Sequence, residues 1–85
     1  MRLKLVYFAW VRERVGRPEE TADVPGEVAT IGDLVRWLKG RGEEYAYAFE
    51  NEGVVRAAID HMHARPEAAL TGAREVAFFP PMTGG

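Results

Sequence analysis

The residues with the clearest chemical potential stand at the end of the chain, in the stretch EVAFFPPMTGG. Pro80 and Pro81 fix the backbone φ angle and donate no hydrogen bond, so they end a strand and begin a stiff, extended stalk. Gly84 and Gly85 have no Cβ atom and can therefore pass through a narrow channel. The carboxylate of Gly85 is unhindered, and once activated, for example as an acyl-adenylate, it can accept a sulfur or amine nucleophile.

The segment from Pro80 to Gly85 is the expected tail of the protein. A tail of this length reaches at most about 20 Å, which is enough to cross the rim of a partner protein and place the chain end inside it. The alternative is a frayed terminus without a function, because Gly-Gly alone is a weak signal. The residues expected to enter the partner's channel are Pro80, Pro81, Met82, Thr83 and Gly84, and the reacting group belongs to Gly85.

Two phenylalanines could form a docking surface beside this tail. Alternation along the strands predicted at 2–10 and 75–79 places Phe8 and Phe79 on the face opposite the core. If these strands are neighbours, both rings stand on one outer surface, and exposed aromatic patches of this kind mark contacts with partner proteins. The sequence leaves open the alternative that a loop or the segment at 43–49 covers this surface.

Other residue types that could carry chemistry give weaker patterns. His61 and His63 stand two residues apart beside Asp60, but no third ligand is evident, so no metal site is predicted. The chain has no cysteine, which excludes a disulfide and a thiolate nucleophile. No phosphate-binding glycine motif precedes a helix, so any nucleotide must bind another protein. Six glutamates fall in predicted turns, helix ends and an edge strand and are expected to be solvated: Glu13, Glu19, Glu20, Glu43, Glu44 and Glu52.

Length and composition limit the class of protein. The 85 residues suit one domain without a deep cleft between lobes, and 47% apolar and 28% charged residues are typical of a folded globular protein. A net charge of −2 without a basic cluster argues against nucleic acid as a partner. No apolar run approaches the roughly 18 residues of a membrane span, and the start of the chain lacks a signal-peptide pattern, which predicts a cytoplasmic protein.

The elements that position the tail follow from periodicity. Strands are predicted at 2–10, 20–24, 54–60 and 75–79, with a short strand or turn at 61–64. Thr30 caps a helix in which Ile31, Leu34, Val35 and Leu38 form one buried stripe. Short helical turns are expected at 11–15, 44–49 and 66–70. The fold class is therefore α+β, a mixed sheet with one main helix packed on one face, in a domain of residues 1–79 followed by a tail of residues 80–85.

EVAFFPPMTGG, together with the opening LVYFAWVRERVG, resembles the small, sulfur-carrying subunit of molybdopterin synthase, a β-grasp protein related in fold to ubiquitin. The two stretches lie at opposite ends, so the resemblance covers essentially the whole chain. It implies that a ubiquitin-activating-like adenylyltransferase uses ATP to adenylate the carboxylate of Gly85, which sulfur then converts to a thiocarboxylate. The chain itself is expected to bind no cofactor.

The resemblance also implies a second partner. The tail in its thiocarboxylate form docks into the large subunit of molybdopterin synthase. The large subunit carries the catalytic side chains and uses the sulfur to build the dithiolene of molybdopterin. In that family the two subunits form a heterotetramer. The matching positions are Gly84 and Gly85 for the carrier tail, Pro80 and Pro81 for the stalk, and Phe8 and Phe79 for the docking surface.

The sequence departs from the family pattern in two turns. Members usually have a small residue, Val or Ile, and then Asn before the fourth strand, where this chain has Ala58-Ile59-Asp60. The usual Asp-Gly-Asp before the last strand is replaced by residues 71–74, TGAR. Both turns lie away from the tail, so we expect them to change local turn geometry.

Three other functions are compatible with the same residues. The tail chemistry also serves sulfur carriers of other pathways, such as thiamine or cysteine synthesis. A ubiquitin-like protein modifier would instead join Gly85 to lysine side chains of target proteins. An interaction module with an inert tail would keep its function without Gly84 and Gly85.

Overall fold

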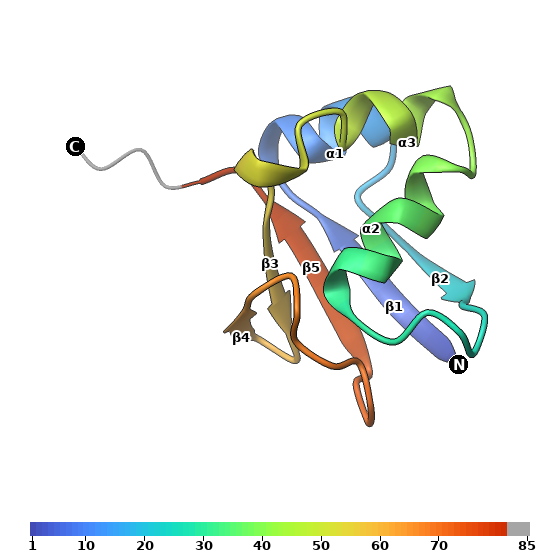
Figure 1. Cartoon of the computed structure of the whole chain (residues 1–85). Coiled ribbons are helices and arrows are strands. Elements are labelled where there is room, and N and C mark those ends of the chain that lie inside the picture. Colours follow the sequence, from blue (N-terminus) through green and yellow to red (C-terminus); the bar gives the residue numbers. More distant parts are fainter. Residues whose placement is uncertain (82–85) are drawn as a thin grey trace.

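A five-stranded mixed sheet forms the body of the protein, and the computed structural model describes residues 1–81 (Figure 1). The first and last strands, β1 and β5, are parallel neighbours in the middle of the sheet, and the other pairs are antiparallel. This arrangement confirms the expected α+β, β-grasp fold. The strands are β1 (Arg2–Tyr7), β2 (Glu19–Asp23), β3 (Arg56–Ile59), β4 (Met62–Ala64) and β5 (Glu75–Phe79), in the order β2-β1-β5-β3-β4 across the sheet.

Three α-helices occur in residues 1–81: α1 (Ala9–Val15), α2 (Ile31–Lys39) and α3 (Glu43–Ala48). The longest, α2, crosses one face of the sheet and is the main helix that the sequence predicted, while α1 and α3 lie together at one end of the sheet (Figure 1). The turns predicted at 11–15 and 44–49 belong to α1 and α3. None of these helices has the length and apolar character that a membrane span requires.

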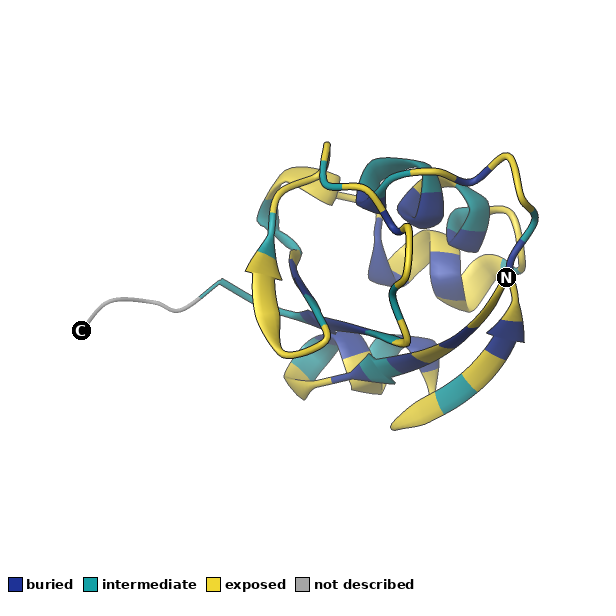
Figure 2. Ribbon diagram, turned by 90° about the horizontal axis from the view of Figure 1, so that it is seen from below, coloured by how far each residue is buried: buried dark blue, intermediate teal, exposed yellow. Residues whose placement is uncertain are grey.

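The hydrophobic core lies between the helices and the inner face of the sheet. Alternation along β1 buries Leu3, Leu5 and Tyr7, as predicted. The ring of Phe78 on β5 stacks on Tyr7 with 6.2 Å between centroids and meets Phe49 edge-on at 5.0 Å. Figure 2 shows that burial is concentrated along the central strands, whereas β2 and β4 at the two sheet edges are mostly exposed.

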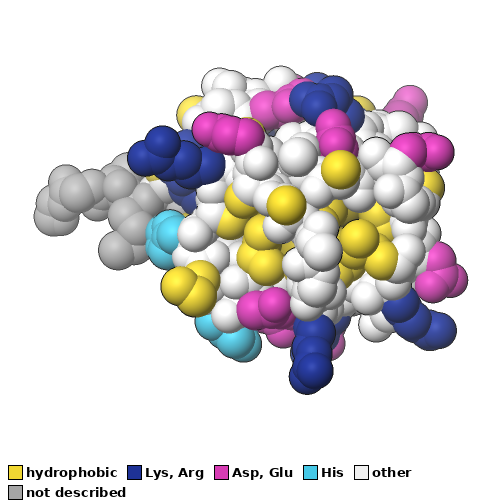
Figure 3. Space-filling view, turned by 60° about the horizontal axis from the view of Figure 1, so that its bottom comes forward, with side chains coloured by type: hydrophobic (Ala, Val, Ile, Leu, Met, Phe, Trp, Pro, Cys, Tyr) yellow, Lys and Arg dark blue, Asp and Glu magenta, His cyan; other side chains and the backbone are white. Residues whose placement is uncertain are grey.

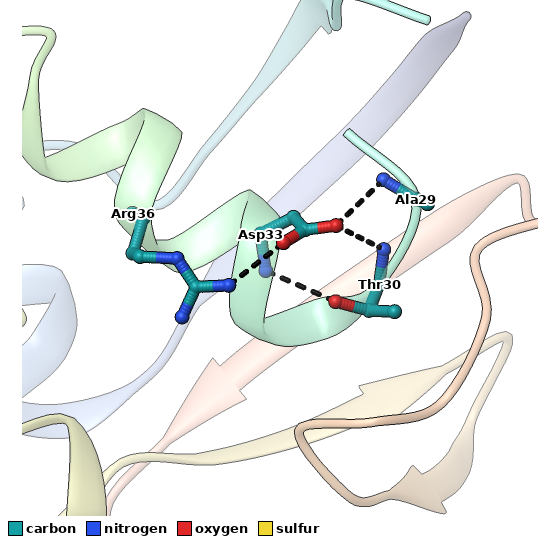
Figure 4. A network of polar contacts seen from close by, with 4 residues as sticks. All are labelled: Ala29, Thr30, Asp33 and Arg36. Atoms are coloured by element: carbon teal, nitrogen blue, oxygen red, sulfur yellow. Dashed lines mark hydrogen bonds and ion pairs between the residues drawn. The ribbon is translucent and has the colours of Figure 1, made fainter. Parts of the chain in front are cut away.

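A capping box fixes the start of α2, as Thr30 and the buried stripe predicted (Figure 4). The hydroxyl of Thr30 accepts a 3.1 Å hydrogen bond from the N–H of Asp33, and the Asp33 carboxylate accepts one from the N–H of Thr30 at 3.2 Å. The same carboxylate accepts from the N–H of Ala29 and pairs with Arg36 at 2.7 Å. These contacts, first the bond from Ala29, hold the pKa of Asp33 below its ordinary value.

The predicted strand at 2–10 is too long. β1 ends at Tyr7, Phe8 serves as the N-cap of α1, and Ala9 already belongs to that helix. The reason is a change of backbone direction, because Ala9 has a positive φ of 51°. The predicted strand at 54–60 also shortens to β3, since a 3₁₀ turn, η1 (Glu52–Val54), precedes it.

The helical turn predicted at 66–70 is wrong. This segment forms a turn and then an isolated bridge between Ala69 and Thr30. The carbonyl of Pro66 accepts from the N–H of Gly32 at 2.8 Å, and that of Ala68 accepts from the N–H of Ile31 at 3.1 Å. The backbone is therefore held by the first turn of α2, and it satisfies two of the amides that a helix start leaves unpaired.

The two turns that depart from the family pattern contact each other. Asp60 and His61 connect β3 to β4 with positive φ angles of 48° and 72°. The Asp60 carboxylate accepts from the N–H of Arg74 at 3.1 Å and of Glu75 at 3.0 Å. The hairpin is thereby tied to the start of β5.

A buried carboxylate anchors α3 to the sheet. Only 8% of the Glu20 side chain is exposed, and it accepts hydrogen bonds from the hydroxyls of Tyr7 and Tyr45 and pairs with Arg41 at 3.1 Å. The expectation that Glu20 is solvated is wrong, because Tyr45 on α3 and Arg41, which precedes α3, contact its carboxylate. Burial alone would raise the pKa of Glu20, but the bonds from Tyr45 and Tyr7 and the charge of Arg41 leave it below its ordinary value.

Candidate functional site: the outer sheet face and the base of the tail

The base of the tail is fixed at the centre of the sheet. β5 ends at Phe79, with β1 on one side and β3 on the other, and the half-buried Pro80 and Pro81 follow directly. Neither proline can extend the sheet, because their nitrogens carry no hydrogen. The other predicted tail residues lie outside the described residues: Met82, Thr83, Gly84 and Gly85.

Phe8 and Phe79 lie beside each other at the end of the sheet where the tail begins. The register pairs Tyr7 with Phe78, so the residues that follow them in the two parallel strands are also neighbours. The N–H of Phe8 donates a 3.0 Å bond to the carbonyl of Phe78, which fixes this relationship. Phe8 is 47% exposed and Phe79 is half-buried.

Small side chains extend this surface from the two rings along the neighbouring strands of the sheet. Ala77 on β5 pairs with Val6 on one side and with Ala58 on the other. Side chains at these ladder positions point away from the core, since those of Tyr7, Ala57 and Phe78 point into it. We call the surface formed by Val6, Phe8, Ala58, Ala77 and Phe79 the outer sheet face.

The outer sheet face is not covered by the segment at 43–49. α3 packs through Tyr45 and Ala48, and the following Phe49 meets Phe78 on the opposite, inner side of the sheet. The sequence left open whether this surface is exposed or covered. The structure shows an exposed Phe8 and a half-buried Phe79.

Two polar residues beside Phe79 were not found by sequence reasoning. His63 on β4 meets the Phe79 ring edge-on at 5.4 Å between centroids. Arg56 on β3 pairs with Phe79 across the ladder, and its guanidinium donates a 2.8 Å bond to the carbonyl of Gly53. Only the strand register brings these residues to the base of the tail, and register is a long-range property.

The two histidines do not act together. His61 lies in the turn before β4, with its Nε2 atom 3.8 Å from a carboxylate oxygen of Glu75, whereas His63 lies on β4 and contacts Phe79. In residues 1–81 no three His, Asp or Glu side chains are grouped closely enough to hold a metal ion.

The outer sheet face offers a partner an apolar contact surface. The side chains of the outer sheet face are aromatic or aliphatic, so they offer an apolar contact to a partner and no acid, base or nucleophile.

Comparison with known proteins agrees with this arrangement. The model of the ThiS family matches residues 5–85. The molybdopterin synthase sulfur carrier subunit of Escherichia coli (strain K12) is 35% identical over 98% of this chain and 99% of its own length, and that of Haemophilus influenzae is 32% identical over the same shares. The structure of SAMP1, small archaeal modifier protein 1 of Haloferax volcanii, superposes over all of both chains with a TM-score of 0.73 at 26% identity. This chain belongs to the ThiS family.

Proposed function

We propose that this protein is the sulfur carrier subunit of a molybdopterin synthase and that Gly85 carries the sulfur. The observation that supports this most directly is the similarity to two sulfur carrier subunits over 98% of the chain. The fold adds a physical reason, because the strand that leads into the tail is held on both sides in the centre of the sheet. The protein would work in the cytoplasm, where ATP is available for activation.

The proposed chemistry takes place at one carboxylate. An oxygen of the Gly85 carboxylate attacks the α-phosphorus of ATP on an adenylyltransferase, which forms an acyl-adenylate and releases pyrophosphate. A sulfide sulfur then attacks the carbonyl carbon and displaces AMP, leaving a thiocarboxylate. In the large subunit this sulfur attacks a carbon of the pterin precursor and displaces an oxygen substituent from it, which forms a thioester between the precursor and Gly85. Water then hydrolyses the bond between the acyl carbon and sulfur, which returns the Gly85 carboxylate and leaves the sulfur on the product as a thiolate.

The outer sheet face would bind the large subunit while the tail enters its active site. Phe8 and Phe79 border the base of the tail, so a partner that accepts the tail also meets these rings. Aromatic side chains that lose water on binding contribute much of the affinity of protein interfaces. The catalytic side chains would belong to the large subunit, and the expected assembly is a heterotetramer.

Intact mass spectrometry tests the carrier chemistry. The full chain and a chain without Gly85 are incubated with the adenylyltransferase, ATP and sulfide. We expect a mass increase equal to the exchange of one oxygen for sulfur in the full chain alone. The thiocarboxylated chain mixed with large subunit and pterin precursor should then return to its original mass as molybdopterin forms. No mass change with an adenylyltransferase that is active on another carrier would contradict the proposal.

A second function is protein modification, which the similarity to the small archaeal modifier protein over the full chain supports. In this case a lysine amine, and not sulfide, attacks the acyl-adenylate and forms an isopeptide bond. The measurement is a denaturing gel of cell extract probed for this protein. Higher bands that disappear when Gly85 is deleted would support modification, and a single band would favour the carrier role alone.

A further inference from the structure

A groove lies between α2, η1 and the β3–β4 hairpin, and it adjoins the outer sheet face through Arg56 and His63. Its volume is about 450 Å³. Apolar side chains line it, with Ile31 and Ala57 buried and Ala64 half-buried. Arg56, His63 and Arg65 also line it. An apolar lining with polar groups at a few places is typical of a binding site.

The charge of this groove is predominantly positive. In residues 1–81 neither Arg56 nor Arg65 forms an ion pair with a carboxylate. The acidic residue that lines the groove, Glu52, is already paired with Lys39 at 3.1 Å. The groove therefore offers two guanidinium groups to an acidic ligand.

The edge of the sheet beside this groove can accept another strand. Asp60 and His61 form a two-residue turn, so Ile59 and Met62 are the hydrogen-bonded pair that closes it. The next pair, Ala58 and His63, is then a non-hydrogen-bonded pair. The N–H and C=O groups of each residue point away from the other strand of the hairpin. Because β4 is the last strand of the sheet, the backbone groups of His63 face the open edge.

A second hollow of about 590 Å³ continues along β4 on the turn side, and it shares His63, Ala64 and Arg65 with the groove. Ile59, Met62 and Ala68 line this hollow, and Met62 is 74% exposed. The acidic residues Asp60 and Glu67 line it as well, and the Asp60 carboxylate already accepts hydrogen bonds from the N–H groups of Arg74 and Glu75. Figure 3 shows hydrophobic side chains gathered on this side of the molecule, with the histidines and both basic and acidic side chains around them. The two hollows together follow the length of β4.

We propose that this edge, formed by β4 and the two hollows, binds an extended segment of a partner protein with acidic side chains next to an apolar one. The segment pairs with the N–H and C=O of His63, its acidic side chains meet Arg56 and Arg65, and its apolar side chain covers Met62 and Ala68. This is strand addition at a sheet edge, in which backbone bonds supply affinity and side-chain pockets supply specificity. Charge complementarity favours acidic side chains at the groove, where Arg56 and Arg65 lie, and an apolar side chain at the second hollow, which Asp60 and Glu67 also line. The site does not depend on the proposed sulfur chemistry.

The test uses the ¹⁵N-labelled full chain and two pools of capped, degenerate hexapeptides. One pool combines Asp and Glu with Val, Ile and Leu, and the other replaces the acids by Lys and Arg. We expect the acidic pool to shift the amide signals of His63, Ala64 and Arg65, and the basic pool to bind at least about tenfold more weakly. The Arg56→Glu/Arg65→Glu variant should lose the shifts. The control Arg2→Glu/Arg12→Glu carries the same charge change on β1 and α1 and should keep them.

A pair of variants tests the backbone contact. His63→Pro and His63→Ala both lose the imidazole, but only the proline variant loses the N–H that faces the open edge. Because that N–H is not used by β3, the proline variant should fold. We expect binding of the acidic pool to fall at least about tenfold in His63→Pro relative to His63→Ala.

Four results would overturn the proposal. These are no amide shift at millimolar peptide, equal binding of both pools, and shifts confined to the outer sheet face. The fourth is a shift of the same amide signals in the absence of peptide. If deletion of residues 82–85 causes the shift, the chain's own tail is the occupant. If dilution of the protein causes it, the occupant is a second copy of the chain.

Discussion

The hydroxyl of Tyr7 donates a 2.8 Å hydrogen bond to the carboxylate of Glu20, and this contact joins the central strand β1 to the edge strand β2 beneath α3. Tyr45 on α3 donates to the same oxygen, and Arg41 pairs with the other one. Burial and the neighbouring carboxylate raise the pKa of both tyrosines, so each remains a hydrogen-bond donor at neutral pH. One carboxylate on β2 thus connects this strand to β1 and to α3.

We expect Glu20→Gln to lower the free energy of unfolding by about 1–3 kcal/mol, because two buried hydroxyls and a guanidinium lose a charged acceptor. Urea unfolding measures this value. The control is Glu19→Gln, whose carboxylate pairs with Lys4 at 3.4 Å on an exposed surface and should matter little. Equal losses in the two variants would show that the buried network has no special role.

Acid should destabilise the protein partly through Glu20. The folded pKa of Glu20 lies below the unfolded value of roughly 4.3. The stabilisation it provides is fully present above that unfolded value and is lost as the pH falls through the folded pKa. Unfolding free energies measured between neutral pH and pH ~3 should therefore fall more steeply for the parent than for Glu20→Gln. Parallel curves would contradict the assignment.

Phe8→Ala should weaken binding of the large subunit about tenfold or more while the fold is retained, since an exposed ring beside the tail is removed. Titration calorimetry with the large subunit measures the dissociation constant, and circular dichroism checks the fold. Tyr47→Ala is a matched control, because Tyr47 is 52% exposed but lies on α3, away from the outer sheet face. An unchanged dissociation constant for Phe8→Ala would exclude this surface from the interface.

The β3–β4 turn gives two glycine variants with opposite expected effects. His61→Gly should stabilise the protein by about 0.5–1 kcal/mol, because His61 has a φ of 72° and glycine adopts this conformation without strain. Asp60→Gly relieves a similar φ but removes the acceptor for the N–H groups of Arg74 and Glu75, so it should destabilise. Thermal unfolding of both variants checks this, and a shift of the same sign in both would refute the argument.

The parts of the fold that follow from local signals were predictable. Thr30 and the apolar stripe predicted α2, alternation predicted which side chains of β1 and β5 enter the core, and the prolines predicted where β5 ends. In two places where the prediction was wrong, a distant partner determines the structure. Residues 66–70 form no helical turn because α2 takes their carbonyl groups, and the Glu20 side chain is shielded from water because Tyr45 and Arg41 contact its carboxylate. Periodicity in the sequence carries no information about either contact.

The same holds for the candidate site. The sequence identified Phe8 and Phe79, because their faces follow from alternation within each strand. It missed His63 and Arg56, whose positions beside Phe79 depend on the register between three strands. The edge of β4 was also missed, since a strand's place in the sheet is a property of the complete topology.

The position of β5 between a parallel and an antiparallel neighbour has a mechanical consequence. A pull on Pro80 along the strand direction loads the hydrogen bonds to β1 and β3 in shear, so that both ladders must yield together and not one bond at a time. A tail attached to an edge strand would instead peel away from the sheet. A partner can therefore bind this chain end tightly, and the tail can be pulled out of the partner, without unfolding the domain.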